Sequence, residues 1–363
     1  MSSQSKYRAC LLGGAAGDAL GYAVEFMSTD WIYSKYGKNG ITEYDLKGGV
    51  ARISDDTQMT LFTANGLLIG KMQGKRIWFK PDYAASIKEC YTDWLNTQFE
   101  SYPLKSQRSW LANIPELFQS RAPGNTCLSA ISMGCSGTVS SPINNSKGCG
   151  GVMRVAPIGL YKPFKSEAKN DMLGAEAAAL THGHELGYIP AAALVHIISL
   201  VVHNDSSLLD AVNDSISATK KLFPNAAHLG EFVDIMNRAV ELSKNDMPDL
   251  EAIELLGEGW VAEECLAIAV YCALRYEHDF DKALITSVNH SGDSDSTGTA
   301  TGNILGAYLG MEGIPQKYLD KLELKDIITE IADDLFNGSQ PHKQLAGDKM
   351  WVEKYVKATY KIQ

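Results

Sequence analysis

Apolar residues recur at intervals of three and four along most of the chain. Tyr83, Ile87, Tyr91, Trp94 and Leu95 form one such set, and this spacing places its members on one face of a helix. Runs in which apolar and polar residues alternate are few, and the sequence does not show strand and helix patterns following each other in turn. The pattern predicts a mostly α-helical protein. Ser207 and Asp279 are predicted helix caps, and Pro190 is predicted to lie in a first helical turn.

Segments rich in glycine, serine and proline separate these helical stretches at 121–126, 134–151 and 291–298. Such segments are typical of loops. None of them is long or charged enough for an interdomain linker, and no internal repeat of roughly 20 to 50 residues is present. We therefore predict one compact helical domain that spans residues 1–363.

The composition narrows the class of protein. Apolar residues make up 45% of the chain and charged residues 21%, which is typical of a globular protein with a sizeable core. The net charge of −10 argues against nucleic acid and anionic membranes as partners, since both require clustered lysine and arginine. The longest apolar stretch, Ala191 to Val202, is shorter than the roughly 20 residues that cross a bilayer, so we predict no membrane span.

Two features indicate a cytoplasmic protein. The chain starts with a polar segment, and the apolar stretch after it is interrupted by Gly17 and Asp18, which is unlike a secretory signal. The seven cysteines are odd in number and include no C-x-x-C pair, as expected for reduced thiols in a core.

Two clusters of carboxylates carry the most specific chemistry. Asp55 and Asp56 follow Ser54 at a predicted helix start, where a serine cap and the helix dipole would stabilise them by about 0.3–1 kcal/mol each. When this cluster is considered by itself, a helix cap is a sufficient explanation for its residues. Asp293 and Asp295 lie among glycines and hydroxyls, a setting that provides oxygen ligands for Mg²⁺, Mn²⁺ or Ca²⁺.

The sequence disfavours other metals and joins the two clusters in one hypothesis. No H-E-x-x-H or C-x-x-C zinc motif is present, and the EF-hand spacing is absent. If Asp55, Asp56, Asp293 and Asp295 meet, repulsion between like charges raises their pKa values unless cations neutralise them. We predict that these four residues form one divalent-metal site.

Glycines mark two further regions. Gly13, Gly17 and Gly21 are spaced at four residues, which favours a close approach of two helices over dinucleotide binding, because no strand precedes them. The segment 148–151 (GCGG) fits a phosphate cradle formed by backbone N–H groups and fits equally a tight turn, with Arg154 in a structural ion pair. We interpret His182 as a ligand-pocket residue and not as a metal ligand.

Seven motifs together resemble the ADP-ribosylglycohydrolase family. They follow one another along nearly the whole chain: GDALGYAVEF at 17–26, SDDTQM at 54–59, RAPG at 121–124, GCGGVMR at 148–154, THGHELGY at 181–188, GWVAEE at 259–264 and NHSGDSDSTG at 289–298. The resemblance implies an all-α, single-domain orthogonal helical bundle with a central dinuclear site for two Mg²⁺ or Mn²⁺ ions.

The resemblance also implies roles for individual residues. The family's metal ligands correspond to Ser54, Asp55, Asp56, Asp293, Asp295 and Ser296. Its diphosphate loop corresponds to Gly148, Cys149, Gly150 and Gly151. Glu25 matches a glutamate beside the metals, and His182 matches a residue near the ribose. Arg121 to Gly124 resemble the branch of the family that acts on arginine, and Arg121 and Gly124 are expected to bind the substrate.

The implied activity is hydrolysis of the N-glycosidic bond that joins ADP-ribose to a modified protein side chain, with ADP-ribosylarginine as the predicted substrate and ADP-ribose as the product. Asp55 or Asp56 is the expected base, and Glu25 assists. The alternatives are an ADP-ribosylserine or O-linked ADP-ribose hydrolase, an immunity protein with a toxin as partner, and a metal-dependent nucleotide phosphohydrolase. A family member without catalysis is disfavoured because both acidic clusters are complete.

Overall fold

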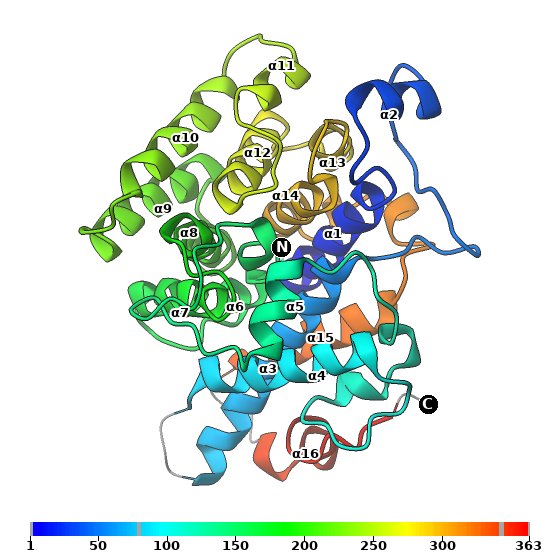
Figure 1. Cartoon of the computed structure of the whole chain (residues 1–363), viewed down its shortest axis with the longest axis vertical. Coiled ribbons are helices and arrows are strands. Elements are labelled where there is room, and N and C mark those ends of the chain that lie inside the picture. Colours follow the sequence, from blue (N-terminus) through cyan, green and yellow to red (C-terminus); the bar gives the residue numbers. More distant parts are fainter. Residues whose placement is uncertain (1–2, 78–80, 341–344, 362–363) are drawn as a thin grey trace.

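The structure is a computed structural model that describes residues 3–77, 81–340 and 345–361. This part of the chain forms an all-α bundle without a strand, as predicted, and contains only four isolated β-bridges (Figure 1). The ends of the predicted domain and the segments 78–80 and 341–344 lie outside the described residues. The α-helices are α1 (Ser3–Gly21), α2 (Thr29–Tyr36), α3 (Asp55–Ile77), α4 (Tyr83–Phe99), α5 (Asn125–Ser132), α6 (Ala156–Tyr161), α7 (Glu167–Ala179), α8 (Glu185–His203), α9 (Leu208–Leu222), α10 (Leu229–Leu242), α11 (Asp249–Glu254), α12 (Ala262–Arg275), α13 (Phe280–Val288), α14 (Ser294–Leu309), α15 (Lys325–Ser339) and α16 (Lys349–Tyr355).

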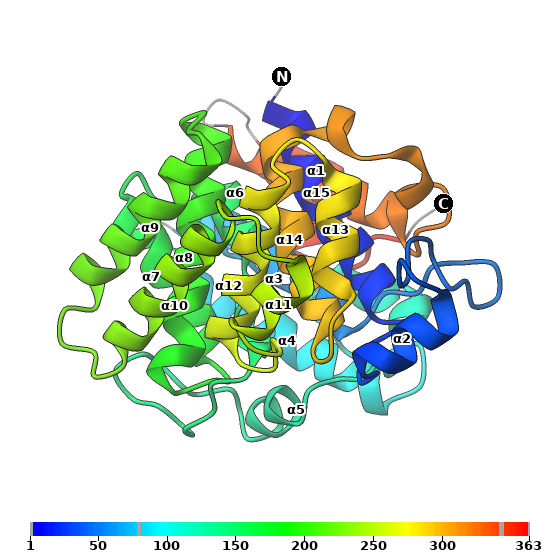
Figure 2. The ribbon, with the colours of Figure 1, turned by 90° about the horizontal axis from the view of Figure 1, so that it is seen from above.

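Helices α1 and α14 pack against each other at the centre of the bundle. In both views α14 lies between α1 and α12 (Figure 1 and Figure 2). The close approach depends on glycine: a Cβ atom at Gly17 would lie 2.0 Å from the carbonyl oxygen of Gly298, and one at Gly302 would lie 2.0 Å from that of Gly13. The predicted helix contact through the glycines of α1 is therefore confirmed.

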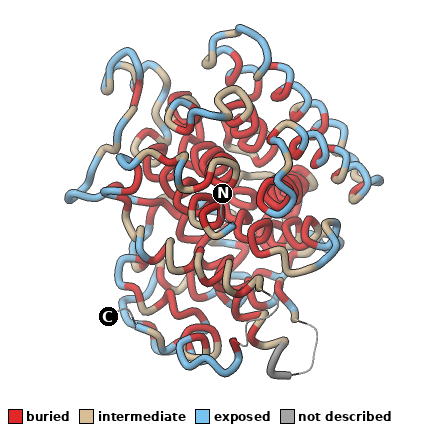
Figure 3. Tube along the Cα trace, turned by 180° about the vertical axis from the view of Figure 1, so that it is seen from behind, coloured by how far each residue is buried: buried red, intermediate tan, exposed pale blue. Residues whose placement is uncertain are grey.

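Burial follows the same arrangement. The buried part of the chain fills the middle of the molecule, and the exposed segments lie at its periphery (Figure 3). Helix α8 is apolar on all sides, as expected for a helix surrounded by others. Among the described residues, α8 is the one helix that is long and apolar enough to cross a membrane, but 94% of its apolar window is buried inside the protein, which is typical of a core helix.

Helix starts agree with the sequence where a side chain can cap the first turn. Ser207 and Asp279, both predicted caps, accept hydrogen bonds from the backbone N–H groups of Asp210 and Lys282. The prediction for Pro190 is wrong, because it lies inside α8 and not in its first turn. Burial on every side of α8 holds the helix together where the proline removes a backbone donor.

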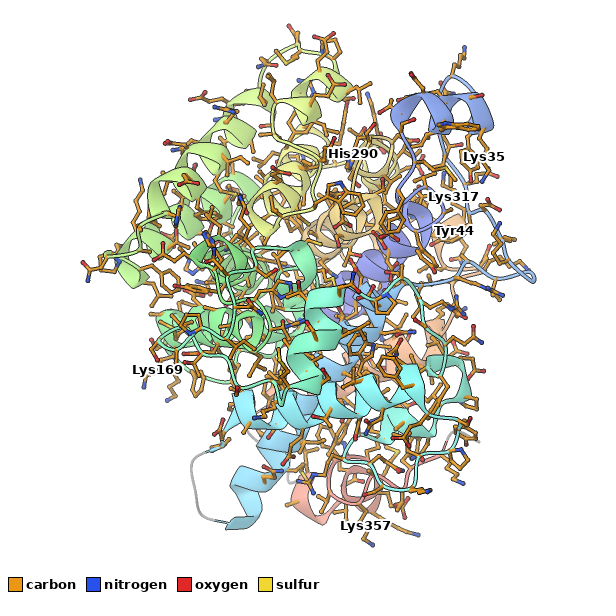
Figure 4. All side chains as sticks on the ribbon, viewed as in Figure 1. Lys35, Tyr44, Lys169, His290, Lys317 and Lys357 are labelled. Atoms are coloured by element: carbon orange, nitrogen blue, oxygen red, sulfur yellow. The ribbon has the colours of Figure 1, made fainter. Side chains whose placement is uncertain are left out.

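The long loop between α2 and α3 is fixed to the segment that precedes α15. Figure 4 shows Tyr44 and Lys317 next to each other at that side of the molecule. The Tyr44 hydroxyl donates to the carbonyl of Tyr318 over 3.0 Å, and the Lys317 ammonium donates to the carbonyl of Thr42 over 3.1 Å. These contacts fix the path of the chain into the start of α3.

Candidate active site

A cavity of about 300 Å³ opens where the starts of α3 and α14 meet the loops of the bundle. Most of the sequence-predicted site residues line it: Glu25, Asp55, Asp56, Gly124, Gly148, Cys149, Gly150, His182, Asp293, Asp295 and Ser296. Ser54, Arg121 and Gly151 are not among the lining residues. Tertiary packing thus joins the two carboxylate clusters, which stand far apart in the sequence.

Asp18 of α1 fixes the first turn of α3. Its carboxylate accepts hydrogen bonds from the backbone N–H groups of Ser54, at 2.8 Å, and Thr57, at 3.1 Å, and from the Thr57 hydroxyl. These bonds add to the predicted serine cap, since the Ser54 hydroxyl accepts from the Asp56 N–H over 3.2 Å. Burial raises the pKa of Asp18 to about 6, although the same hydrogen bonds oppose the rise. The sequence analysis did not predict this role.

A second contact orients the same turn. The backbone N–H of Asp55 donates to the carbonyl of Arg121 over 3.0 Å. Together with Asp18, this contact holds the first turn of α3 so that Asp55 and Asp56 line the cavity.

The start of α14 is fixed by its own acidic residues. Asp293 caps the helix, and both Asp293 and Asp295 accept from the Ser296 N–H, at 3.3 and 3.0 Å. The N–H of Asp293 donates to the Glu258 carbonyl over 2.8 Å. Gly292 is required beside this contact, because its φ is 130° and a Cβ atom there would lie 2.0 Å from the Glu258 carbonyl oxygen. The helix-cap interpretation and the cavity-lining position are therefore both true of Asp293.

The cavity is strongly acidic and lacks a neutralising side chain. No lysine or arginine of the described residues lines it. Burial raises the pKa of Asp295 to about 7 and that of Glu25 to about 10, where repulsion from Asp295 and Asp293 adds to the effect. Burial also raises the pKa values of Asp55, Asp56 and Asp293 well above their usual range, with mutual repulsion contributing.

Two of these carboxylates retain an unused oxygen. In the described part of the chain, Oε2 of Glu25 and Oδ2 of Asp56 are buried and have no hydrogen-bond partner. Buried polar atoms without partners are rare in proteins and often mark a site for a ligand or ion. Carboxylate and hydroxyl oxygens are the donors that Mg²⁺ and Mn²⁺ prefer, so the residues present fit such an ion.

The carboxylates are nevertheless not arranged as a formed metal site. No group of three or more histidine, cysteine, aspartate or glutamate side chains within the described residues has the geometry to hold an ion. Rotation of the side chains around an ion would therefore have to accompany binding.

Three residues of the glycine loop 148–151, namely Gly148, Cys149 and Gly150, line the same cavity as the first turn of α3. The N–H of Cys149 donates to the Trp260 carbonyl over 3.1 Å, and the N–H of Ala262 donates to the Lys147 carbonyl over 2.9 Å. The Cys149 N–H is therefore occupied and is not a free donor for a phosphate cradle. The Cys149 thiol donates to Oδ2 of Asp293 over 2.6 Å, which links this loop directly to the acidic cluster.

Two aromatic residues at the cavity were missed by the sequence analysis. Phe26 stacks on Trp260 with ring centroids 5.3 Å apart, and 69% of Phe26 is exposed. Phe26 also adopts a φ of 65°, an uncommon backbone conformation for a residue other than glycine. Both residues stand inside motifs noted above, so a large aromatic side chain in a glycine-containing loop was the available signal.

Arg121 lies away from the cavity, although it was predicted to bind substrate. Its guanidinium donates to Gln119 over 2.5 Å and to Glu323 over 3.2 Å, and the side chain is buried. Its backbone carbonyl, which accepts from Asp55, is what connects it to the site. The structure therefore gives the residue a supporting position.

Comparison with known proteins identifies the class of this molecule. The family model described as ADP-ribosylglycohydrolase matches residues 1–344. The chain is 30% identical to the ADP-ribosylhydrolase ARH3 of Mus musculus over 49% of this chain and 53% of that protein, so this match spans about half of the relative's length. It is 23% identical to the ADP-ribosylarginine hydrolase Tri1 of Serratia proteamaculans, over 92% and 80% of the two chains.

The fold agrees with this class. A solved structure titled ADP-ribosylglycohydrolase-related protein complex superposes with a TM-score of 0.64 at 21% identity, and the match covers 93% of this chain and 99% of that chain. The fold is all-α, and the family match identifies the protein as a glycohydrolase. The chain belongs to the ADP-ribosylglycohydrolase family, whose members remove ADP-ribose from modified molecules, and the resemblance drawn from the motifs is confirmed.

Proposed function

We propose that this protein hydrolyses the N-glycosidic bond between ADP-ribose and an arginine side chain, with two Mg²⁺ or Mn²⁺ ions as cofactors. The observation that carries the proposal is the cavity in which Asp55, Asp56, Asp293 and Asp295 face the glycine loop and His182. One wall can hold cations, and the other can receive the phosphates of ADP-ribose.

The charge of the cavity favours arginine as the modified residue. Five carboxylates line it, and no lysine or arginine of the described chain does. A guanidinium is cationic and remains so at every physiological pH, so it enters this field more favourably than a neutral serine oxygen. The name of the Serratia relative, an ADP-ribosylarginine hydrolase, agrees with this choice.

The metal ions would be held by Ser54, Asp55, Asp56, Asp293, Asp295 and Ser296. When bound, they would act as Lewis acids that lower the pKa of a nearby water and hold the ribose hydroxyls. The residues of the chain provide the rest of the chemistry.

Asp56 is the proposed base. Its Oδ2 is buried without a partner among the described residues, so it can accept a proton from water as that water attacks the anomeric carbon. The sugar passes through an oxocarbenium-like state, whose positive charge the surrounding carboxylates stabilise. Glu25, which also has an unused oxygen, contributes to the same field, and the guanidine leaves as a neutral group.

A panel of substrates tests this function. The protein is incubated with peptides carrying ADP-ribosylarginine or ADP-ribosylserine and with poly-ADP-ribose, each with Mg²⁺ or Mn²⁺ and with a chelator. Release of ADP-ribose from the arginine peptide alone, abolished by the chelator, is expected. Preferential release from the serine peptide would overturn the arginine assignment.

A second arm tests the alternative of a nucleotide phosphohydrolase. Free ADP-ribose is offered as the substrate, and cleavage of its diphosphate would yield AMP and ribose phosphate. Under the proposed function ADP-ribose stays intact. An immunity protein would use the same active site on a different substrate. This alternative is tested by release of ADP-ribose from a protein that a toxin has modified.

A further inference from the structure

Arg154 is a buried cation without an anionic partner. It is fully buried, and no carboxylate lies within ion-pair distance of it in the described part of the chain, which removes the ion-pair alternative of the sequence analysis. Its guanidinium lies over the ring of Tyr91, 4.5 Å from the centroid, and donates to the carbonyl of Ala177 over 3.0 Å. An unpaired buried charge is costly, so its position calls for a physical reason.

The strongest contact of Arg154 leads toward the cavity. Its Nη2 donates to Oγ1 of Thr181 over 2.6 Å, and the same hydroxyl lies 2.8 Å from Nδ1 of His182. His182 lines the cavity. Arg154 precedes α6, and Thr181 and His182 follow α7. These two helices pack against each other (Figure 1), which brings the three residues together.

The direction of each hydrogen bond in this row follows from proton counting. A guanidinium can only donate, and a hydroxyl has one proton to give. The Thr181 hydroxyl accepts from Arg154, and its proton has three acceptors within reach: Nδ1 of His182 at 2.8 Å, the Ala178 carbonyl at 3.4 Å and the Cys127 sulfur, which is a weak acceptor. The shorter distance favours His182, which makes Nδ1 an acceptor.

The imidazole then carries its proton on the other nitrogen. Burial lowers the pKa of His182 to about 3, and the charge of Arg154 contributes, so the ring is neutral and holds a single N–H. With Nδ1 accepting, that N–H is on Nε2. In the described residues Nε2 has no hydrogen-bond partner, and Cβ atoms built at Gly148 and Gly150 would each lie 3.3 Å from it.

We propose that Arg154 and Thr181 are positioning residues that fix His182 as the Nε2–H tautomer, so that the imidazole presents a donor beside the glycine loop. The proposal rests on the proposed function for its ligand, the diphosphate of ADP-ribose. Phosphate oxygens only accept hydrogen bonds, so a histidine fixed as a donor recognises them, whereas the opposite tautomer would present a lone pair and repel them. The two glycines leave room for this approach.

The tautomer is measured first, in protein without ligand. Long-range proton–nitrogen NMR correlation spectra of protein labelled at histidine separate protonated from unprotonated ring nitrogens, and the His182 signal is identified by its loss in His182→Gln. Protonated Nε2 and unprotonated Nδ1 are expected in the wild type and in Thr181→Ser. In Thr181→Val the chemical shifts of both ring nitrogens should move toward the average of the two tautomers. A wild-type protein protonated on Nδ1 would overturn the proposal.

Ligand binding is measured second, by calorimetry in Mg²⁺ with ADP-ribose, ADP and adenosine. Thr181→Val should weaken ADP-ribose and ADP by about tenfold each, the loss expected for one hydrogen bond to a charged group, and should leave adenosine unchanged. Thr181→Ser should restore binding of both. His182→Gln retains an N–H and should bind ADP more tightly than His182→Leu. Equal binding by Gln and Leu, or loss confined to ADP-ribose, would overturn the proposal.

Controls separate this proposal from a general loss of structure and from the proposed function. Thr219→Val removes another buried threonine hydroxyl, on α9, which bonds the Ile216 carbonyl over 2.9 Å, and it should change neither the tautomer nor binding. The tautomer is independent of hydrolysis. Protonated Nε2 without cleavage of any ADP-ribosylated substrate would thus reject the proposed function and keep the positioning role.

Discussion

The carboxylates that line the cavity and the carboxylate of Asp334, which contacts α16, are all buried. Only Asp334 is neutralised by a cationic side chain of the protein. Asp334 accepts from the Lys354 ammonium over 2.6 Å and from the Tyr355 hydroxyl over 2.5 Å. Lys354 is buried and also pairs with Glu330 over 2.7 Å. The cavity carboxylates have no such cation, and Asp56 retains an oxygen without a partner in the described chain.

The difference separates structural from functional burial of charge. A buried pair that satisfies itself contributes to docking of a helix, here the attachment of α16 to α15. A buried cluster that repels itself is tolerated in a folded protein only if protons or metal ions neutralise it. The contrast leads to four predictions. In the first two, removal of a charged side chain has opposite consequences for activity and stability in the two regions.

The largest expected effect is on catalysis. Asp56→Asn and Asp295→Asn should each lower the rate of ADP-ribose release by about a thousandfold, since a lost metal ligand removes several kcal/mol of transition-state stabilisation. Helical circular dichroism should be unchanged, and the free energy of unfolding without metal should not fall, because one of several repelling charges is gone. Full activity in either variant would reject the site.

Lys354→Met should give the reverse pattern. Removal of the cation leaves Asp334 buried and unpaired, which should lower the free energy of unfolding by about 3–5 kcal/mol, measured by urea denaturation. Activity per folded molecule should match the wild type. The double variant with Asp334→Asn serves as the control and should recover part of the loss. A loss below about 1 kcal/mol would place this pair with ordinary surface ion pairs.

The third prediction concerns pH, where the sign follows from the raised pKa values. The folded pKa values of Asp18, about 6, and Asp295, about 7, exceed those of the unfolded chain. Their contribution to stability is therefore present below the unfolded pKa, at about pH 4, and is lost as pH rises through 6 to 7. The melting temperature of chelated protein should fall over this range.

Added Mg²⁺ should then raise the melting temperature more at about pH 8 than at about pH 5, because cations replace the lost protons. Differential scanning calorimetry measures both effects. In Asp295→Asn the fall with pH should be shallower. An identical Mg²⁺ effect at the two pH values would argue against metal binding by this cluster.

The smallest expected effect concerns Cys149, whose thiol donates to Asp293. Cys149→Ala removes a donor that orients a predicted metal ligand and should weaken Mg²⁺ by about tenfold. Cys149→Ser keeps a donor and should bind close to the wild type. Calorimetric titration with Mg²⁺ measures both, and equal affinities in the Ala and Ser variants would show that the thiol plays no part.

The local sequence pattern was sufficient to predict the fold class and some of the helix starts. The 3.6-residue spacing predicted helices, and Ser207 and Asp279 cap them as expected, because these signals act within one turn of the chain. Pro190 was placed wrongly, since the burial that lets α8 continue through a proline comes from other helices.

Side-chain direction was beyond the sequence. Arg121 stands in a motif with Ala122, Pro123 and Gly124, which line the cavity, yet its own guanidinium turns to Glu323. The sequence analysis named Asp18 only as an interruption of an apolar stretch, because its role in holding the first turn of α3 depends on contact between helices. Both outcomes depend on partners that stand far away in the chain.

The sequence by itself determined the helical class, the glycine face of α1, two acidic clusters of oxygen ligands and the resemblance to a family. The tertiary structure decided that the four predicted aspartates share one cavity and that Asp18 holds the turn that carries two of them. It also placed Arg154 and Thr181 behind His182. The physical reason is that aspartate and serine serve both as helix caps and as metal ligands. Only the residues that folding brings next to them distinguish the two roles.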